Sequence, residues 1–149
     1  MTDPSFTIRD MYGRLLDGAV LHKGQPVGVF DGFAPKDTPT PYIILGNQTF
    51  VPRDGGASRC FVMSDCAIVV IVVTSFPGAE QGNKKYMDDI SSQVMSIMMP
   101  APGAVISFES PAFINMQTKL AGTTTTNSQD ATRKHHEKAI RFTHLVKEQ

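Results

Sequence analysis

The sequence predicts an α+β fold: a mostly antiparallel β-sheet with one amphipathic helix packed on it and a short N-terminal helix. Two observations lead to this prediction. The run Cys66–Thr74 is mostly β-branched and lacks strict alternation, which is typical of a central strand covered on both faces. Between Gly78 and Pro100, apolar residues recur at steps of three and four, which is typical of an amphipathic helix. The 149 residues suffice for one sizeable core, so a single domain is expected over 1–149.

A short helix is expected at the N-terminus, ending near residue 17. Pro4 fits its first turn, Asp3 is a candidate N-cap and Gly18 ends it. Its loose apolar stripe consists of Phe6, Ile8, Met11, Leu15 and Leu16. Residues 19–41 are rich in Gly and Pro and predict a long insert with a short strand or two. Three prolines within seven residues exclude an interior strand or a helix from the end of this insert, Asp31–Pro41.

The central part of the chain predicts two strands and a helix. A strand is expected at Tyr42–Gly46, and Arg53–Gly56 turns the chain toward the strand Cys66–Thr74. In an open monomeric sheet one face of that strand would be wet, so a helix or another subunit must cover it. The helix is expected between Gly78 and Pro100, with an apolar stripe of Tyr86, Met87, Ile90, Val94, Ile97 and Met98. Asp88 and Asp89 lie in its N-terminal half, where the helix dipole favours them.

The C-terminal third predicts a hairpin with a long tip. Residues Phe113–Leu120 alternate tolerably and indicate a strand. Residues 122–132 are polar and of low complexity, and a mobile loop is expected there. A last strand is expected at Ala139–Val146, with Ile140, Phe142 and Leu145 on one face.

Composition and charge exclude several classes of protein. Fourteen Lys and Arg balance fourteen Asp and Glu, which removes the electrostatic case for a nucleic-acid binder. The longest apolar run has eight residues, against roughly 20 needed to span a bilayer, and the polar start lacks the apolar region of a secretory signal. Residues 133–149 carry five basic and two acidic side chains, while the rest of the chain is mildly acidic. This asymmetry suits self-association or an acidic partner, or equally a solvated last strand.

Residues with catalytic or ligand-binding chemistry are few. Neighbours on a strand point to opposite faces, so His135 and His136 are not expected to chelate one metal ion. Cys60 and Cys66 lack the CxxC spacing of a zinc or redox site, and Cys66 is expected in the core. A nucleophilic set of Cys60, His144 and Asp65 can be drawn, but no spacing distinguishes it from chance. We therefore predict no catalytic residue, no cofactor-binding residue, no metal ligand and no cofactor.

Residues 41–99 resemble the tail terminator and tail completion proteins of tailed phages, which act in head–tail joining at the neck. In that family a strand of the form Pro-Tyr, three aliphatic residues and Gly precedes a long apolar strand, as Pro41–Gly46 precedes Asp65–Thr74 here. A loop and a helix follow, as with Ser75–Glu80 and Lys84–Met99. The insert 19–41 is longer than the linkers usual in the family.

The resemblance implies a structural virion protein and not an enzyme. Members of the family form rings, typically hexamers, that terminate the tail tube and join it to the head–tail connector. The expected partners are therefore copies of the chain itself, the tail tube and the proteins of the connector and portal complex. Genomic DNA would only pass through the lumen, no membrane is involved, and the expected location is the virion, with the host cytoplasm during assembly. The insert 19–41 and the loop 122–132 are candidate arms between rings.

Two alternatives remain open from the sequence. The chain could be a connector adaptor or a minor capsid protein of the same virion, which predicts twelve-fold symmetry or a capsid contact. It could also be a small α+β ligand-binding or enzyme domain, because pockets need no sequence motif. That class predicts a monomer or dimer with a concave apolar cleft.

Overall fold

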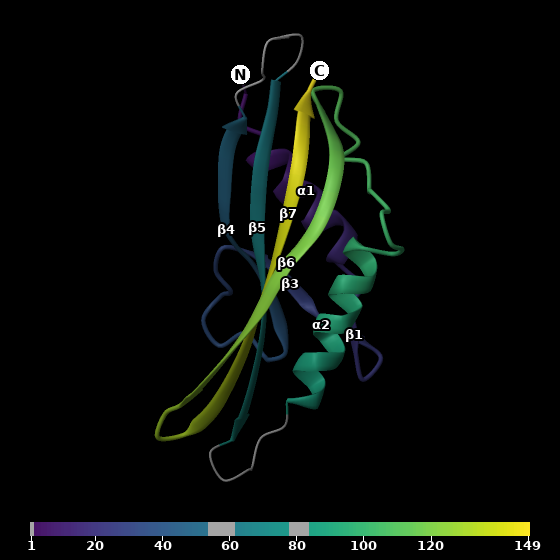
Figure 1. Ribbon diagram of the computed structural model, residues 1–149. Helices are drawn as coiled ribbons and strands as arrows, with labels where there is room; N and C mark the ends of the chain where they lie inside the picture. The colour runs from purple at the N-terminus through teal and green to yellow at the C-terminus, as the bar shows by residue number, and fades with distance from the viewer. Residues whose placement is uncertain (1, 54–61, 78–83) are drawn as a thin grey trace.

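The computed structural model describes residues 2–53, 62–77 and 84–149 (Figure 1). Its elements are α1 (Ser5–Leu16), β1 (Leu21–His22), β2 (Gln25–Pro26), β3 (Gly28–Asp31), β4 (Tyr42–Arg53), β5 (Val62–Pro77), α2 (Lys85–Met98), β6 (Phe113–Gln129) and β7 (Arg133–Glu148). Five strands form a sheet in the order β3-β4-β5-β7-β6, in which only the β3–β4 pair is parallel. Strands β1 and β2 form a separate antiparallel ribbon. The predicted α+β fold with a mostly antiparallel sheet is confirmed.

Both helices pack on the same face of the sheet. Alternate residues of β5, from Cys66 to Val72, lie in one core with the buried sides of α1 and α2. In Figure 1 the sheet is seen from its other face, and α1 passes behind it. Within the described residues both helices lie on one face and none covers the other, so cover of that second face by another subunit stays a prediction. Neighbouring side chains bury Ala67 and Val73 there, while Val69 and Ile71 stay partly exposed.

The two helices begin and end close to the predicted positions. The N-cap of α1 is Pro4 and not Asp3, although the Asp3 carboxylate accepts hydrogen bonds from the backbone N–H and the hydroxyl of Ser5, at 2.8 and 2.6 Å. Gly18 follows the helix with φ of 74°, a conformation that favours glycine. In α2, Asp88 lies in the first turn and accepts a hydrogen bond from Lys138 of β7 at 3.1 Å. The buried side of α2 consists of Met87, Ile90, Ser91, Val94 and Met98.

The Gly/Pro-rich insert 19–41 contains more strand than expected. Strands β1, β2 and β3 lie in its first half, and residues 32–41 form neither helix nor strand, as the prolines predicted. Strand β3 is short because Gly32 follows it with φ of 80° and turns the chain away from the sheet. Strand β4 continues past Gly46 to Arg53, with a register shift between Leu45 and Gln48. The expected turn at residues 54–56 lies outside the described residues.

The prediction of a polar loop at 122–132 is wrong, because most of this segment is strand. Residues 122–129 belong to β6 and pair in register with β7, from Gly122 opposite Arg141 to Gln129 opposite Lys134. Four consecutive threonines are β-branched and suit a strand, so polarity alone was a poor guide here. The turn is confined to 130–132, where the Asp130 carboxylate accepts hydrogen bonds from the backbone N–H groups of Thr132 and Arg133. Figure 1 shows the β6–β7 hairpin extending beyond the helices.

Two further details of the hairpin differ from the prediction. In β7, Ile140, Phe142, His144 and Val146 are buried under the helices, so Leu145 faces the opposite side of the sheet. In β6, register shifts between Asn115 and Gln117 and between Leu120 and Gly122 interrupt the alternation. Among the described residues, no helix is long and apolar enough to cross a membrane.

Candidate assembly surfaces

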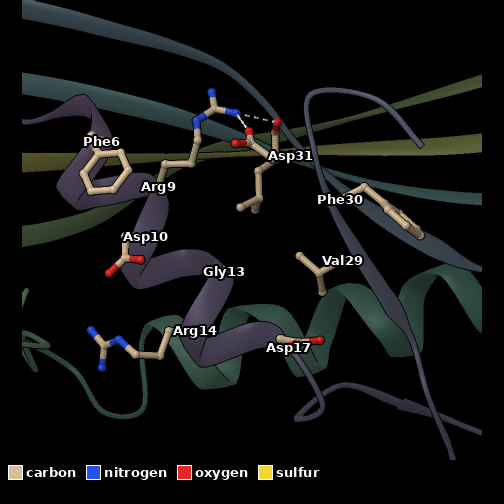
Figure 2. Close-up of a pocket in the computed structure, with 10 residues that line it drawn as sticks. Phe6, Arg9, Asp10, Gly13, Arg14, Asp17, Val29, Phe30 and Asp31 are labelled. Atoms are coloured by element: carbon tan, nitrogen blue, oxygen red, sulfur yellow. Dashed lines mark hydrogen bonds and ion pairs between the residues drawn. The ribbon is translucent and has the colours of Figure 1, made fainter. Parts of the chain in front are cut away.

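Arg9 fixes α1 to the edge of the sheet formed by β3 and β4. Its guanidinium forms an ion pair with Asp31 of β3 and donates to the carbonyl oxygens of Leu45 and Gly46 at 3.1 and 2.8 Å. It also donates to the Gln48 side chain at 2.8 Å. Figure 2 shows Arg9 reaching from α1 to Asp31. The partly exposed Arg9 side chain, with its five N–H donors, thus holds a helix and two strands together.

A groove of about 440 Å³ lies between α1 and β3. Figure 2 shows Gly13 of α1 and Val29 of β3 on its two sides. Because Gly13 has no side chain, the middle of the groove is open, and an added Cβ would meet Leu45 Cδ1 at 3.9 Å, an ordinary contact. Apolar side chains that line the groove include Val29 and Leu45, whereas the Phe30 ring points away from α1 (Figure 2).

The rim of this groove carries an exposed aromatic ring and two unpaired carboxylates. Phe6 was predicted to lie in the buried stripe of the helix, but it is 80% exposed and lines the groove. Its position is one turn before Arg9, which points to the sheet edge and not into the core. Asp10 and Asp17 also line the groove, and their carboxylates form no ion pair or hydrogen bond within the described residues. The Arg14 guanidinium is instead paired with Glu109 at 3.0 Å.

The opposite edge of the sheet, strand β6, exposes apolar side chains next to a lysine. Ile114, Met116 and Leu120 are all more than a third exposed, although they are large and apolar. Met116 lies at the register shift, where a bulge re-aims a side chain. Lys119 between them is exposed and has no partner within the described residues. The strand register places Leu120 opposite Phe142, on the face that carries the helices, and Ile114 opposite Lys147, on the other face.

The face of the sheet that carries no helix is partly apolar. Ile44 of β4 lies opposite Ile71 of β5, and both are partly exposed. At the end of this face, Arg53 donates two hydrogen bonds to the Asp65 carboxylate, at 2.6 and 2.9 Å. This bond to Asp65 raises the pKa of Arg53 above its ordinary value. The pair is exposed and contributes little to stability.

The buried side of the fold contains a polar network around His144. Its Nε2 lies 2.7 Å from the Tyr12 hydroxyl, and its Nδ1 lies 3.2 Å from both Asn115 Oδ1 and Thr118 Oγ1. Since an amide oxygen only accepts, these partners favour the neutral ring with its proton on Nδ1 and Tyr12 as donor. The ring is 2% exposed, and burial lowers the pKa of His144 to about 4. Sequence periodicity did not indicate this network, because its members come from three elements.

The structure does not assemble the nucleophilic set drawn from the sequence. Cys60 lies outside the described residues. Asp65 pairs with Leu145 across the β5–β7 ladder and Cys66 pairs with His144, so Asp65 and His144 point to opposite faces of the sheet. Cys66 is buried in the core, as predicted, and burial raises the pKa of its thiol. A buried neutral thiol is a packing residue and a poor nucleophile.

The adjacent histidines of the hairpin have separate partners. His135 Nε2 lies 3.0 Å from the Asp130 carboxylate, whereas His136 Nδ1 lies 2.6 Å from Asn127 Oδ1. The bond from His135, together with backbone N–H groups, lowers the pKa of Asp130 well below its ordinary value. Burial, followed by the charges of Lys84 and His135, lowers the pKa of His136. The His135–Asp130 and His136–Asn127 contacts join the two strands next to the turn at 130–132.

Comparison with known proteins gives a match of fold. The chain is similar to a chain in the solved virion of a native gene transfer agent particle, with a TM-score of 0.58 and 13% sequence identity. The similarity covers 96% of this chain and 90% of that one. No protein-family model matches the sequence. No curated protein matches it either. At this identity the match shows a shared fold.

Proposed function

We propose that this chain is a structural virion protein of a tailed, phage-like particle. In this proposal it is a subunit of a ring in the neck, a homohexamer, that terminates the tail tube and joins it to the head–tail connector. The observation that carries the proposal is the similarity, over almost the whole chain, to a chain of the gene transfer agent virion. The resemblance of residues 41–99 to tail terminator and tail completion proteins supports the neck position.

The surfaces of the molecule support a ring. The two edges of the sheet, β3 and β6, are different surfaces at opposite ends of the strand order. A contact between unlike surfaces is heterologous, and repeating it by rotation closes a ring. A balance of 14 basic and 14 acidic residues lets identical copies pack without strong mutual repulsion. Genomic DNA, in this proposal, passes through the lumen and is not bound by the ring.

The proposed partners are copies of the chain, the tail tube and the connector proteins, and the proposed location is the virion neck, after assembly in the host cytoplasm. The proposal includes no enzymatic activity, cofactor or membrane contact. The β6–β7 hairpin extends beyond the helices and replaces the loop 122–132 as the candidate arm toward a neighbouring ring. The insert 19–41 remains the second candidate arm.

Reconstruction of the particle by electron cryomicroscopy tests the proposal. We expect density that fits this chain in a six-fold ring between the tail tube and the connector. A twelve-fold position in the connector, or a place in the capsid shell, would contradict the neck ring in favour of an adaptor or a minor capsid protein. Absence of the chain from purified particles would refute the virion role, and a solitary molecule with a ligand in its groove would indicate a binding domain.

A further inference from the structure

We propose that the outward side of α1 in one copy of this chain packs on the helix-free face of the sheet in the next copy. This inference rests on the proposed function and names the contact by which the ring closes. Two surfaces meet in it. The α1 stripe consists of Phe6, Asp10, Gly13 and Asp17, and the free-face patch consists of Val69, Ile114, Lys119, Arg141 and Leu145.

The α1 stripe points away from the core of its own molecule. Its positions are spaced by four, three and four residues, so they share one side of the helix. The buried residues of the helix, Ile8, Met11, Tyr12 and Leu16, occupy the other side. Phe6 is 80% exposed, and the carboxylates of Asp10 and Asp17 form no ion pair or hydrogen bond within the described residues. The stripe thus offers an aromatic ring, two negative charges and, at Gly13, a point where another backbone can approach closely.

The free-face patch lies on the side of the sheet that carries neither helix, the side seen in Figure 1. In β7, Arg141 and Leu145 alternate with residues that are buried under the helices, so both point to the free face. The register between β6 and β7 brings Lys119 and Ile114 to that same face. From β5, the partly exposed Val69 lies beside Arg141. Three strands therefore contribute to one continuous surface.

The two surfaces carry opposite charge. Lys119 and Arg141 are exposed and form no ion pair within the described residues. The Asp65 carboxylate, which lies opposite Leu145 in the ladder, is bound to Arg53 instead. The free charge of the patch is therefore positive, whereas that of the α1 stripe is negative. Such complementarity favours the contact and fixes its orientation.

The spacing of the apolar and charged groups agrees between the two surfaces. Along α1, Phe6 and Asp10 are separated by about 6 Å, at about 1.5 Å per residue. In the sheet, the row of Leu145 and the row of Lys119 are separated by about 7 Å, at about 3.3 Å per residue. With α1 antiparallel to β7, Phe6 lies on Leu145 and Asp10 lies on Lys119.

A second charge pair follows in the same orientation. Asp17 lies about 10 Å beyond Asp10 along α1. Arg141 lies one row, about 7 Å, beyond Lys119 in the sheet. The long, flexible side chain of Arg141 spans the remaining few ångströms to the Asp17 carboxylate. One orientation of the helix therefore satisfies the apolar contact and both charge pairs.

The two surfaces lie on opposite sides of the molecule, so neither can reach its counterpart within one chain. One copy can bind a neighbour through each surface at the same time. A contact between unlike surfaces propagates in one direction and closes as a ring when each copy is rotated relative to the last. The contact also covers the partly exposed Val69 and Ile71 on the free face of β5.

Photo-crosslinking tests the contact directly. The photoreactive residue p-benzoylphenylalanine replaces Phe6 in the full-length chain, which is mixed with isotope-labelled wild type at concentrations up to the millimolar range. We expect crosslinks between copies at the tryptic peptide 142–147, which contains Leu145. The same replacement at Phe33, which is 90% exposed and lies outside the stripe, is the matched control and should not crosslink to this peptide. No crosslink between copies, crosslinks only to other segments, or equal yields from the two positions would overturn the proposal.

Truncation of the same two rings tests the apolar part of the contact. Both rings are exposed in a single copy, so Phe6→Ala and Phe33→Ala should keep a cooperative thermal transition like that of the wild type. By sedimentation equilibrium, self-association should fall at least tenfold in Phe6→Ala, because the contact loses a buried ring. It should stay within about twofold of the wild type in Phe33→Ala. Equal association of the two variants would show that Phe6 lies outside the contact.

A charge exchange tests the orientation. Asp10→Lys should weaken self-association roughly tenfold, because its attraction to Lys119 becomes repulsion. Lys119→Glu in the same chain should restore it. Asp89→Lys, at an exposed position of α2, changes the net charge equally and should alter association by less than about twofold. Weakening by Asp10→Lys that Lys119→Glu does not rescue would overturn the proposed orientation.

Failure of this contact and failure of the proposed function give different results. A six-fold neck ring whose copies meet through other surfaces would overturn the contact alone. Absence of the chain from purified particles would refute the virion role, and crosslinks between Phe6 and the peptide 142–147 would still establish the contact between copies.

Discussion

The buried His144 predicts a loss of stability in mild acid. Its pKa of about 4 in the folded protein lies below the ordinary value of 6.5, because burial penalises the charged ring. Between these two pKa values, His144 binds a proton in the unfolded chain but not in the folded chain. The stability that depends on neutral His144 is fully present above pH 6.5 and is lost progressively as the pH falls toward 4.

The loss of unfolding free energy follows from the pKa of His144 in the unfolded and in the folded protein. The difference between 6.5 and about 4 corresponds to about 3 kcal/mol of unfolding free energy once the pH is below both. At pH 5 about 2 kcal/mol is already lost, because the unfolded histidine is almost fully charged and the folded one is not. Out of a typical total of roughly 5–15 kcal/mol this is a large share.

Urea unfolding measures this loss. The free energy of unfolding is determined at pH 8, 6 and 5 by circular dichroism, at one protein concentration so that self-association stays comparable. The variant His144→Gln removes the titrating group and is expected to lose about 2 kcal/mol less than the wild type between pH 8 and pH 5. His22→Gln is the matched control, since His22 lies in the β1–β2 ribbon outside this network. Parallel losses in wild type and His144→Gln would refute the assignment of a neutral buried His144.

Three further changes test the packing of the fold by the same urea assay. Tyr12→Phe leaves His144 Nε2 without its donor and should cost about 1–3 kcal/mol, and a cost below 0.5 kcal/mol would contradict the hydrogen bond. Arg9→Met removes the link between α1 and the β3–β4 edge and should cost about 1.5–3 kcal/mol, against less than about 1 kcal/mol for Arg14→Met, which loses one largely exposed pair. Ile90→Ala opens a cavity under α2 and should lower the free energy of unfolding by about 2–5 kcal/mol. Val51→Ala, at an exposed position, should change it by less than about 0.5 kcal/mol. Equal costs of the two substitutions would place Ile90 outside the core.

The spacing of apolar residues predicted those helices and strands whose apolar side chains lie in the core. The spacing of Met87, Ile90, Val94 and Met98 predicted a helix between Gly78 and Pro100, and α2 lies inside that range. The β-branched run at 66–74 marked the middle of β5, which extends further at both ends. In both cases the signal and the structure have the same cause, since the apolar side chains that set the period are those that fill the core.

Sequence patterns predicted the wrong conformation where contacts with distant segments of the chain decide it. Residues 122–129 are polar and repetitive, and they become strand because β7 pairs with each of them. Phe6 is apolar and helical spacing alone suggested a core position, but it lines the exposed groove. Leu145 was assigned to the face of Ile140 and Phe142 because it is apolar, although strict alternation places it on the opposite face, as the structure does.

By itself the sequence determined the fold class, the two helices, the central strand and the burial of Cys66, because each depends on neighbours a few residues away. The tertiary structure alone decided the groove at Gly13, the exposed β6 edge, the uncovered face of the sheet and the network of His144. These features join residues from as many as 132 positions apart, as with Tyr12 and His144. No local pattern encodes such contacts, since they arise only when strand order and register bring distant elements together.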